Sequence, residues 1–541
     1  MNKRAILVLS IILAISCNSF AGENNDLRTL FLNNNSNIMG INIRTFNAKD
    51  TNGNEIIDED EESGNFLNAI ERLNELKDMG INTLHVLPIT PVGKLKALGT
   101  AGSLYALAGF NNINEQLVDK NSDLTPKEQA KKFIEEAHAR GIRIIIDLPS
   151  CGAYDLYVQQ PELFIKDDKN ISIVPTDWTD VRLLNTGTNE KLNQDVLDVH
   201  KGFIDMILEL GADGVRADVA TIKPYKFWEE IIKYTRDKDK EFMFLAEASD
   251  SWREPPSQYA VFTPYNELLK AGFDGYYGSF FNLKDWNADE FIEHIKFNQK
   301  LLKSYKEPKS VIMSFTTHDE VSPVVLHGQN FSIMISWLEA VLPFNPYSID
   351  GFAYGDEYIY SWANGQAKYT ETDDDTYFVH RGKLDIFNFS RKPGEVGVKG
   401  INGVNETNEV NENDSLSSNN NSDKTNKNAN NVLENFKQAY KFRADNIDLI
   451  TKGEFVPIKT NDEKVFAFLI SKKGKETEQI VVLGNLDFKN YKNDLTIKIP
   501  KLNKKSKFEL IHGDNNIKFN HKKLHTNLKA GEIKIIKTKN I

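Results

Sequence analysis

The stretch GVRAD at residues 214–218 decides the fold that we expect for this chain. It is a short run of small and apolar residues, interrupted by one arginine, that ends on a carboxylate. Such a run is typical of a buried strand, and a carboxylate at its downstream end is typical of chemistry on the rim of a parallel β-barrel. The stretches FLAE at 244–247 and FTTHD at 315–319 have the same form. Asp218, Glu247 and Asp319 are therefore predicted to share one rim.

Strand-like and helix-like segments alternate on both sides of this stretch. Helical periodicity is present at residues 66–79, 126–140 and 225–237 and in a segment that ends at Leu210. The predicted strands are residues 38–45, 81–89, 142–147, the runs that end at Asp218 and Glu247, and residues 273–281, 310–315 and 349–354. Eight strands that alternate with helices predict a closed (β/α)8 TIM barrel. A doubly wound open sheet is the structural alternative.

The chain has 541 residues, which is too long for one ordinary core. We expect a catalytic barrel over residues 28–400, with a short loop domain at about 150–188. Residues 404–431 contain 11 asparagines and no aromatic residue, so we expect a disordered insertion there. Residues 432–450 are predicted as the last barrel helix, and residues 453–541 as a C-terminal antiparallel β-sandwich domain.

The first 21 residues are typical of a secretory signal peptide. Lys3 and Arg4 precede an apolar run, and small residues lie before a cleavage point at Ala21. The apolar run is shorter than the ~20 residues that span a bilayer. We therefore expect a secreted or periplasmic bacterial protein with no transmembrane segment. Cys17 offers a second interpretation, a lipid anchor, because the residues before it loosely resemble a lipoprotein cleavage box.

Composition excludes several classes of protein. The formal net charge is -11, which gives no basic field for nucleic acid, and a neutral substrate suits this surface better. Once the leader is removed, Cys151 is the last remaining cysteine of the chain, so an intramolecular disulfide is excluded.

The spacing of the acidic residues predicts a glycosidase. Residues two apart on a strand share a face, so Arg216 and Asp218 should form a pair. A nearby guanidinium lowers the pKa of a carboxyl, which would keep Asp218 ionised as a nucleophile. The apolar run before Glu247 should instead raise its pKa, so that it holds a proton for the leaving oxygen. Two carboxyl groups about 5 to 5.5 Å apart would give double displacement with retention through a covalent glycosyl-enzyme.

These motifs resemble the α-amylase family, glycoside hydrolase family 13, over most of residues 38–399 and the β-rich tail. By this resemblance Asp218 is the nucleophile, Glu247 the general acid/base and Asp319 the third carboxylate. The resemblance further implies a retaining α-glycosidase, with an α-glucan or oligosaccharide as its partner. Substrate-binding residues implied in the same way are Arg216, His318 and Tyr105, although Tyr105 could equally be a core tyrosine.

The chain also departs from the family pattern. Where the family has Asp-x-x-x-Asn-His after its third strand, residues 147–152 read DLPSCG, which puts the usual calcium site and one sugar-binding histidine in doubt. Residues 221–222 read TI where many amylases have Lys-His. Two alternatives therefore stay open, an α-glucanotransferase with the same catalytic residues and a non-catalytic glucan-binding protein.

A different calcium site is predicted in the loop after the first strand. Oxygen-bearing groups recur every second residue at Asp50, Asn52, Asn54, the Ile56 carbonyl and Asp58. Calcium prefers six to eight such hard ligands. The loop resembles an EF-hand loop and the calcium loop of oligo-1,6-glucosidases in the same family, which implies a structural calcium ion. A solvated acidic loop is the alternative.

Overall fold

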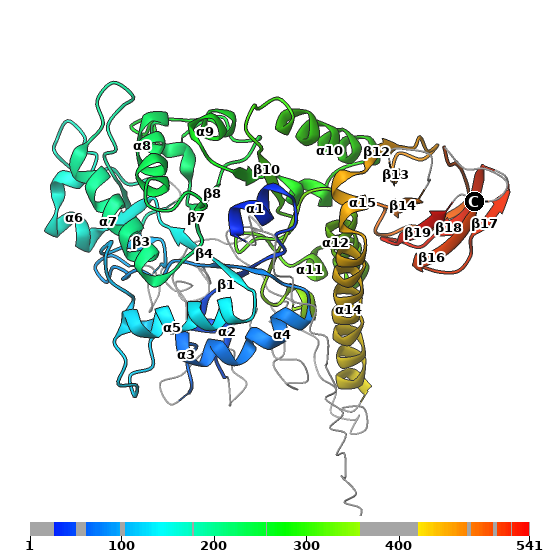
Figure 1. Ribbon diagram of the computed structural model, residues 1–541, viewed down its shortest axis with the longest axis horizontal. Coiled ribbons are helices and arrows are strands. Elements are labelled where there is room, and N and C mark those ends of the chain that lie inside the picture. The colour runs from blue at the N-terminus through cyan, green and yellow to red at the C-terminus, as the bar shows by residue number, and fades with distance from the viewer. Residues whose placement is uncertain are drawn as a thin grey trace, which may run out of the picture.

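The computed structural model describes residues 26–49, 61–97, 103–175, 178–255, 257–356, 420–472, 478–500, 506–520 and 522–539. Eight parallel strands close into a barrel, which forms the larger part of the molecule (Figure 1). In barrel order they are β1 (Ile38–Ile41), β11 (Asn345–Ile349), β10 (Ser310–Met313), β9 (Gly275–Tyr277), β8 (Met243–Ala246), β7 (Gly214–Ala217), β4 (Arg143–Leu148) and β2 (Thr83–Val86). The predicted TIM barrel is therefore confirmed, and the open-sheet alternative is wrong.

Burial explains why these runs form strands. Every residue of the eight strands except Arg143 is buried, as expected where helices cover the outer face and side chains fill the interior. Neighbouring strands are in register near their carboxyl ends, with Asp147 opposite Arg216 and Arg216 opposite Leu245. The residues that follow these strands consequently meet at one rim.

Helices pack around the barrel, and their ends follow local capping rules. Thr125 and Glu128 form a capping box at the start of α5, with Pro126 in the first helical position. Gly211 ends α7 in the left-handed conformation. The helices through residue 356 are α1 (Leu27–Leu32), α2 (Ile43–Phe46), α3 (Phe66–Ala69), α4 (Leu73–Asp78), α5 (Pro126–Ala139), α6 (Tyr154–Gln159), α7 (Gln194–Leu210), α8 (Tyr225–Arg236), α9 (Tyr265–Ala271), α10 (Ala288–Leu302), α11 (Pro323–His327) and α12 (Gln329–Val341).

The last barrel strand differs from the prediction. Residues 349–354 were expected to form it, but β11 spans Asn345–Ile349 and residues Phe352–Tyr354 form a 3-10 turn. Gly351, at a φ of 94°, ends the extended run. Pro346 lies inside β11, opposite Met313. Proline lacks the N–H of a central strand, so the sequence pattern argued against a strand at this position.

A small sheet combines two strands of the predicted loop-domain region with one strand from before it. Strands β5 (Cys151–Ala153) and β6 (Val181–Leu183) pair antiparallel, and β3 (Ala106–Leu107) joins β5 in parallel. Cys151 and Val181 from this sheet line a pocket on the barrel rim. The sheet therefore supplies one wall of that pocket.

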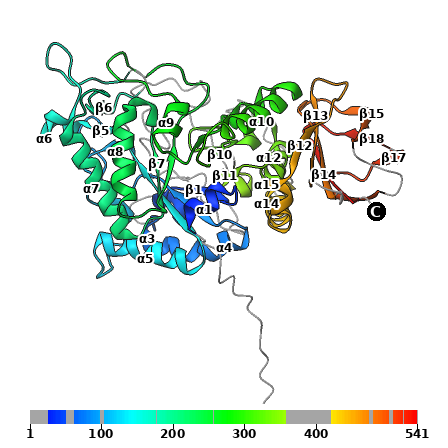
Figure 2. The same cartoon turned by 45° about the horizontal axis from the view of Figure 1, so that its top comes forward.

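The C-terminal strands form two antiparallel sheets. One contains β12 (Glu454–Pro457), β13 (Val465–Ser471), β14 (Glu478–Asn485), β16 (Lys507–His512) and β19 (Ile533–Lys539), and the other contains β15 (Lys492–Lys498), β17 (Lys518–Asn520) and β18 (Lys523–Leu528). Leu469 and Leu483 from the first sheet share an apolar cluster with Ile497 and Leu524 from the second. A shared core between two sheets is a β-sandwich, as predicted (Figure 2).

A long helix, α14 (Asn420–Asp445), connects the two parts and is followed by α15 (Ile447–Lys452). It begins inside residues 404–431, so the expectation of disorder is wrong for residues 420–431, and residues 404–419 lie outside the described residues. Arg443 is fully buried and donates to the carbonyl oxygen of Leu342, and Tyr440 donates to Glu339, which anchors α14 to α12. The predicted leader with Cys17 and the predicted calcium loop also fall outside the described residues.

Candidate active site

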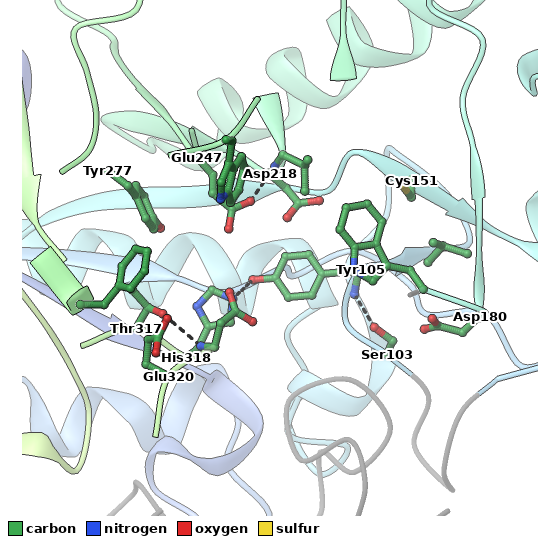
Figure 3. Close-up of a pocket in the computed structure, with 16 residues that line it drawn as sticks. Ser103, Tyr105, Cys151, Asp180, Asp218, Glu247, Tyr277, Thr317, His318 and Glu320 are labelled. Carbon is green, nitrogen blue, oxygen red and sulfur yellow. Dashed lines mark hydrogen bonds and ion pairs between the residues drawn. The ribbon is translucent and has the colours of Figure 1, made fainter. Parts of the chain in front are cut away.

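The predicted acidic residues lie around one pocket of about 380 Å³ at the carboxyl ends of the strands. Asp218 follows β7, Glu247 follows β8, and the segment with His318 and Asp319 follows β10. Figure 3 shows Glu247 and Asp218 side by side on one wall, with Tyr105 and His318 opposite them. The lining residues are Ser103, Tyr105, Cys151, Trp178, Asp180, Val181, Asp218, Val219, Glu247, Trp252, Tyr277, Phe281, Thr317, His318, Asp319 and Glu320.

Arg216 joins the two carboxyl groups. Its Nη1 lies 3.0 Å from Asp218 Oδ1, and its Nη2 lies 2.6 Å from Glu247 Oε1. The same Nη1 also donates to both oxygens of Asp147, at 2.9 and 3.0 Å. The Arg216 side chain is fully buried beneath the pocket and does not line it. Substrate binding by Arg216 stays a prediction, and its contacts in the structure hold the carboxyl groups in place.

Asp147 is a second buried residue that contacts several side chains below the pocket. Its Oδ2 accepts a hydrogen bond from the Tyr105 hydroxyl at 2.9 Å and lies 3.3 Å from His85 Nε2. The other ring nitrogen of His85 lies 2.8 Å from the Tyr347 hydroxyl. Burial lowers the pKa of His85, so this ring stays neutral and links Tyr347 to Asp147.

Tyr105 and His318 form the wall opposite the two carboxyl groups. Their rings are stacked, with centroids 5.6 Å apart and planes 6° apart, and the Tyr105 hydroxyl lies 2.7 Å from His318 Nε2. Asp319 Oδ2 lies 3.6 Å from the same nitrogen. Tyr105 lines the pocket, so the core-tyrosine alternative does not describe its position.

Burial raises the pKa of both candidate catalytic carboxyls, and the charged groups around them differ. Burial raises the pKa of Glu247 to about 8, helped by the negative charges of Asp218 and Asp319 and opposed by Arg216. Burial also raises the pKa of Asp218, against Arg216, the Ser150 N–H and Lys223. Our expectation of a lowered pKa for Asp218 was therefore wrong in direction, because desolvation outweighs the guanidinium. The direction expected for Glu247 agrees with the structure.

The backbone after Asp218 contributes to the site. Val219 has a φ of 35° and a ψ of 53°, a left-handed conformation that β-branched residues rarely adopt. In this conformation its N–H donates to Glu247 Oε2 at 2.7 Å. Local strain at Val219 thus fixes one oxygen of the candidate acid.

Sequence reasoning missed several parts of the site. His85, Ser150 and Lys223 lie in apolar or unremarkable stretches, and nothing in their spacing marked them. The signal for Asp147 was present, since it ends a strand as Asp218 does, but no role was assigned to it. Trp252 and Tyr277 also line the pocket.

The structure does not test the predicted metal site. Asp50, Asn52, Asn54, Ile56 and Asp58 all lie outside the described residues. Within the ranges that the structure describes, no group of three or more His, Cys, Asp or Glu side chains is arranged to hold a metal ion. Calcium stays a prediction for the Asp50 loop.

With this geometry, the chain can be compared with known proteins. No protein-family model matches it. An α-1,4-glucan:maltose-1-phosphate maltosyltransferase of Picrophilus torridus is 28% identical over 299 residues, which are 52% of this chain and 44% of that protein. The α-amylase MalA of Haloarcula japonica is 23% identical over 296 residues, 53% of this chain and 40% of that protein. In both relatives the matching region is less than half of the protein.

Solved structures show the same fold along nearly the whole chain. A maltogenic α-amylase from Thermotoga neapolitana covers 94% of this chain and 99% of its own, with a TM-score of 0.63 at 18% identity. A trehalose-6-phosphate hydrolase from Bacillus licheniformis covers 94% and 99%, with a TM-score of 0.62 at 15% identity. At such identities the likeness concerns the fold alone.

The fold and the site thus define a (β/α)8-barrel protein with paired carboxyl groups at the carboxyl rim of its strands. The predicted resemblance to the α-amylase family is confirmed, by sequence similarity to a maltosyltransferase and an α-amylase and by the shared fold.

Proposed function

We propose that this protein is a retaining glycoside hydrolase that cleaves α-glucosidic bonds of oligo- or polysaccharides. The observation that carries the proposal is the placement of Asp218 and Glu247 on one guanidinium, both lining one pocket. Glu247, whose pKa burial raises to about 8, is assigned the role of the acid, and Asp218, where Arg216 and the Ser150 N–H oppose the effect of burial, is assigned the role of the nucleophile.

In the first step, the Asp218 carboxylate attacks the anomeric carbon, and Glu247 gives its proton to the departing glycosidic oxygen. A covalent glycosyl-enzyme forms, and the leaving sugar departs with that proton. In the second step, the Glu247 carboxylate takes a proton from an incoming hydroxyl, whose oxygen attacks the same carbon and releases Asp218. Two inversions give net retention.

Asp319 and His318 are assigned to the same sugar ring. Asp319 is the most open of the three carboxylates, with its side chain 28% exposed, and it can accept hydrogen bonds from sugar hydroxyls. The flat face of Tyr105 offers apolar contact to the C–H groups of the ring. This arrangement favours catalysis over sugar binding alone, because binding needs no buried acid beside a nucleophile.

A glucanotransferase is the second candidate, favoured by the names of several sequence relatives. The difference lies in whether water or a sugar hydroxyl captures the glycosyl-enzyme. The negative charge of Asp319 in the pocket disfavours a phosphorylated donor, because two negative groups repel at short range. Hydrolysis or transfer from neutral glucans is therefore the form we propose.

The test is incubation with maltooligosaccharides and with α-maltosyl phosphate, following product size and anomeric form. Hydrolysis yields shorter α-anomers, and transfer yields longer chains. We expect α-maltosyl phosphate to react at least about tenfold more slowly than a neutral oligosaccharide. Binding without turnover of any α-glucan would contradict the proposal.

Secretion and calcium complete the proposal. The leader pattern at residues 1–21 supports export to the periplasm or outside the cell, with a lipid anchor at Cys17 as the alternative. Among the helices described, none has the length and apolar character needed to cross a membrane. The Asp50 loop is proposed to hold a structural calcium ion.

A further inference from the structure

A buried lysine lies behind the nucleophile. Lys223 follows the short turn Ala220–Ile222, and only 1% of its surface is exposed. Its Nζ lies 2.7 Å from the Ser150 hydroxyl oxygen and 3.3 Å from the Ser150 carbonyl oxygen. Lys223 does not line the pocket, so it reaches the chemistry through Ser150.

Ser150 connects Lys223 to Asp218 through hydrogen bonds. Its backbone N–H donates to Asp218 Oδ2 at 3.0 Å, and its hydroxyl donates to the backbone carbonyl oxygen of Asp218. Because that hydroxyl proton points to Asp218, the lone pairs of the oxygen are left to accept from Lys223. The two residues therefore fix both the carboxylate and the backbone of Asp218.

Charge gives the lysine a second effect. Asp218 Oδ1 already contacts Arg216, and the positive charge of Lys223 acts in the same direction by lowering the Asp218 pKa. The charged or titratable groups that face Asp218 are Arg216, Asp147, Glu247, Tyr105 and Lys223. Those that face Lys223 are Asp218, the Cys151 thiol and His200, and burial keeps His200 neutral by lowering its pKa to about 3.

Burying this ammonium group works against folding. Desolvation lowers the pKa of Lys223 to about 8, and a buried cation costs free energy unless it is fully paired. Methionine has similar volume and no charge, so a side chain needed only for packing could be apolar. The buried charge of Lys223 is therefore better explained by a role in catalysis than by packing.

We propose that Lys223, acting through Ser150, is a positioning residue that orients Asp218 and helps to keep it ionised. The inference rests on the proposed function, in which Asp218 is the nucleophile. It assigns a role to Lys223 and Ser150 that sequence reasoning did not find.

The test compares wild-type protein with Lys223→Met on a maltooligosaccharide. We expect kcat to fall about 10- to 100-fold, KM to stay within about threefold, and the melting temperature to be unchanged or higher. Removing the cation should raise the Asp218 pKa, so the acidic limb of the kcat/KM profile should move about one unit toward higher pH. An unchanged kcat with an unmoved limb would overturn the inference.

Two further variants separate positioning from simple damage. Ser150→Ala and Lys223→Met should be non-additive in kcat, since both interrupt one contact chain, whereas full additivity would overturn the link. Lys226→Met is the matched control. Its ammonium pairs with Glu229 on the surface of α8, and we expect its kcat and acidic limb to equal those of wild type.

A measurement without turnover distinguishes failure of the inference from failure of the proposed function. The ¹³C NMR signal of the Asp218 carboxyl, assigned by its loss in Asp218→Asn, is titrated in wild type and in Lys223→Met. A higher midpoint in the variant supports the inference even if no α-glucan is cleaved. Equal midpoints contradict it, whatever the substrate.

Discussion

Two buried aspartates at opposite ends of the barrel show what separates a stabilising acid from a reactive one. Asp274 lies at the amino end, just before β9, and Asp218 lies at the carboxyl end, just after β7. Asp274 accepts from Arg28 at 2.9 Å, from Arg236 at 2.7 Å and from the Phe244 N–H at 2.9 Å. Two guanidinium groups thus pair with one carboxylate.

At the carboxyl end of the barrel the ratio of guanidinium groups to carboxyl groups is reversed. Arg216 serves Asp147, Asp218 and Glu247 together. Burial raises the pKa of Glu247 to about 8, and the negative charges of Asp218 and Asp319 add to this rise. The number of guanidinium groups for each carboxylate therefore differs between the carboxylate that stabilises the amino end and those placed for chemistry at the carboxyl end.

The largest effect that this comparison predicts is on turnover. Asp218→Asn and Glu247→Gln should each lower kcat by at least about 10³-fold while sugar affinity is retained. The folded-state pKa of Glu247 exceeds its ordinary value of 4.5, so stability is lost as pH rises from 4.5 toward 8. Glu247→Gln should therefore melt at an equal or higher temperature than wild type at pH 8. Retained turnover in either variant would refute the role assigned to that residue.

Asp274→Asn should have the opposite signature. Loss of the carboxylate leaves Arg236, with only 20% of its side chain exposed, without its charged partner, so the free energy of unfolding should fall by about 3 kcal/mol. Activity per folded molecule should stay within about twofold of wild type. Denaturant titration together with kinetics measures both quantities.

Asp205→Asn is the matched control for that variant. Its carboxylate pairs with Lys238 where both side chains are more than 40% exposed, so the cost should be below about 1 kcal/mol. If Asp274→Asn is no more destabilising than Asp205→Asn, then cation pairing at the amino end is not what stabilises the barrel.

The pH profile sharpens the contrast further. Glu247 must be protonated to act as the acid, so kcat/KM should fall about tenfold per pH unit above about 8. Glu320 also lines the pocket, and burial raises its pKa to about 7. In Glu320→Gln the basic limb should stay near pH 8. A shifted limb would name Glu320, instead of Glu247, as the titrating group.

The parts of the fold that follow from local patterning were predictable. Continuous apolar runs gave seven barrel strands, and capping residues such as Thr125 gave helix positions. The eighth strand was predicted at the wrong residues. Proline disfavours a central strand locally, but β11, which contains Pro346, pairs with β10 and forms a strand nevertheless. Disorder was predicted for residues 404–431 from composition, yet α14 begins at Asn420.

The residues of the site likewise divide into those that the sequence predicted and those that it did not. The acids Asp218, Glu247 and Asp319 could be found because each follows a strand-like run. Arg216 could also be paired with Asp218 from its spacing, but the other residues that support the acids could not be found, because their contacts join distant parts of the chain. Ser150 meets Asp218 across 68 positions, and His85 meets Tyr347 across 262. The net pKa of Asp218 also depends on burial, which spacing alone does not give.

The smallest predicted effect concerns the calcium ion that the sequence predicts for the Asp50 loop. Chelation should lower the melting temperature by about 2–4 °C, because a ligand that binds only the folded state stabilises it by mass action. Calcium should restore the loss and magnesium should not, since magnesium demands a tighter octahedral site. Asp50→Asn should abolish this dependence. If the melting temperature of the wild-type protein does not change on chelation, the loop is an acidic loop solvated by water, and the calcium prediction is wrong.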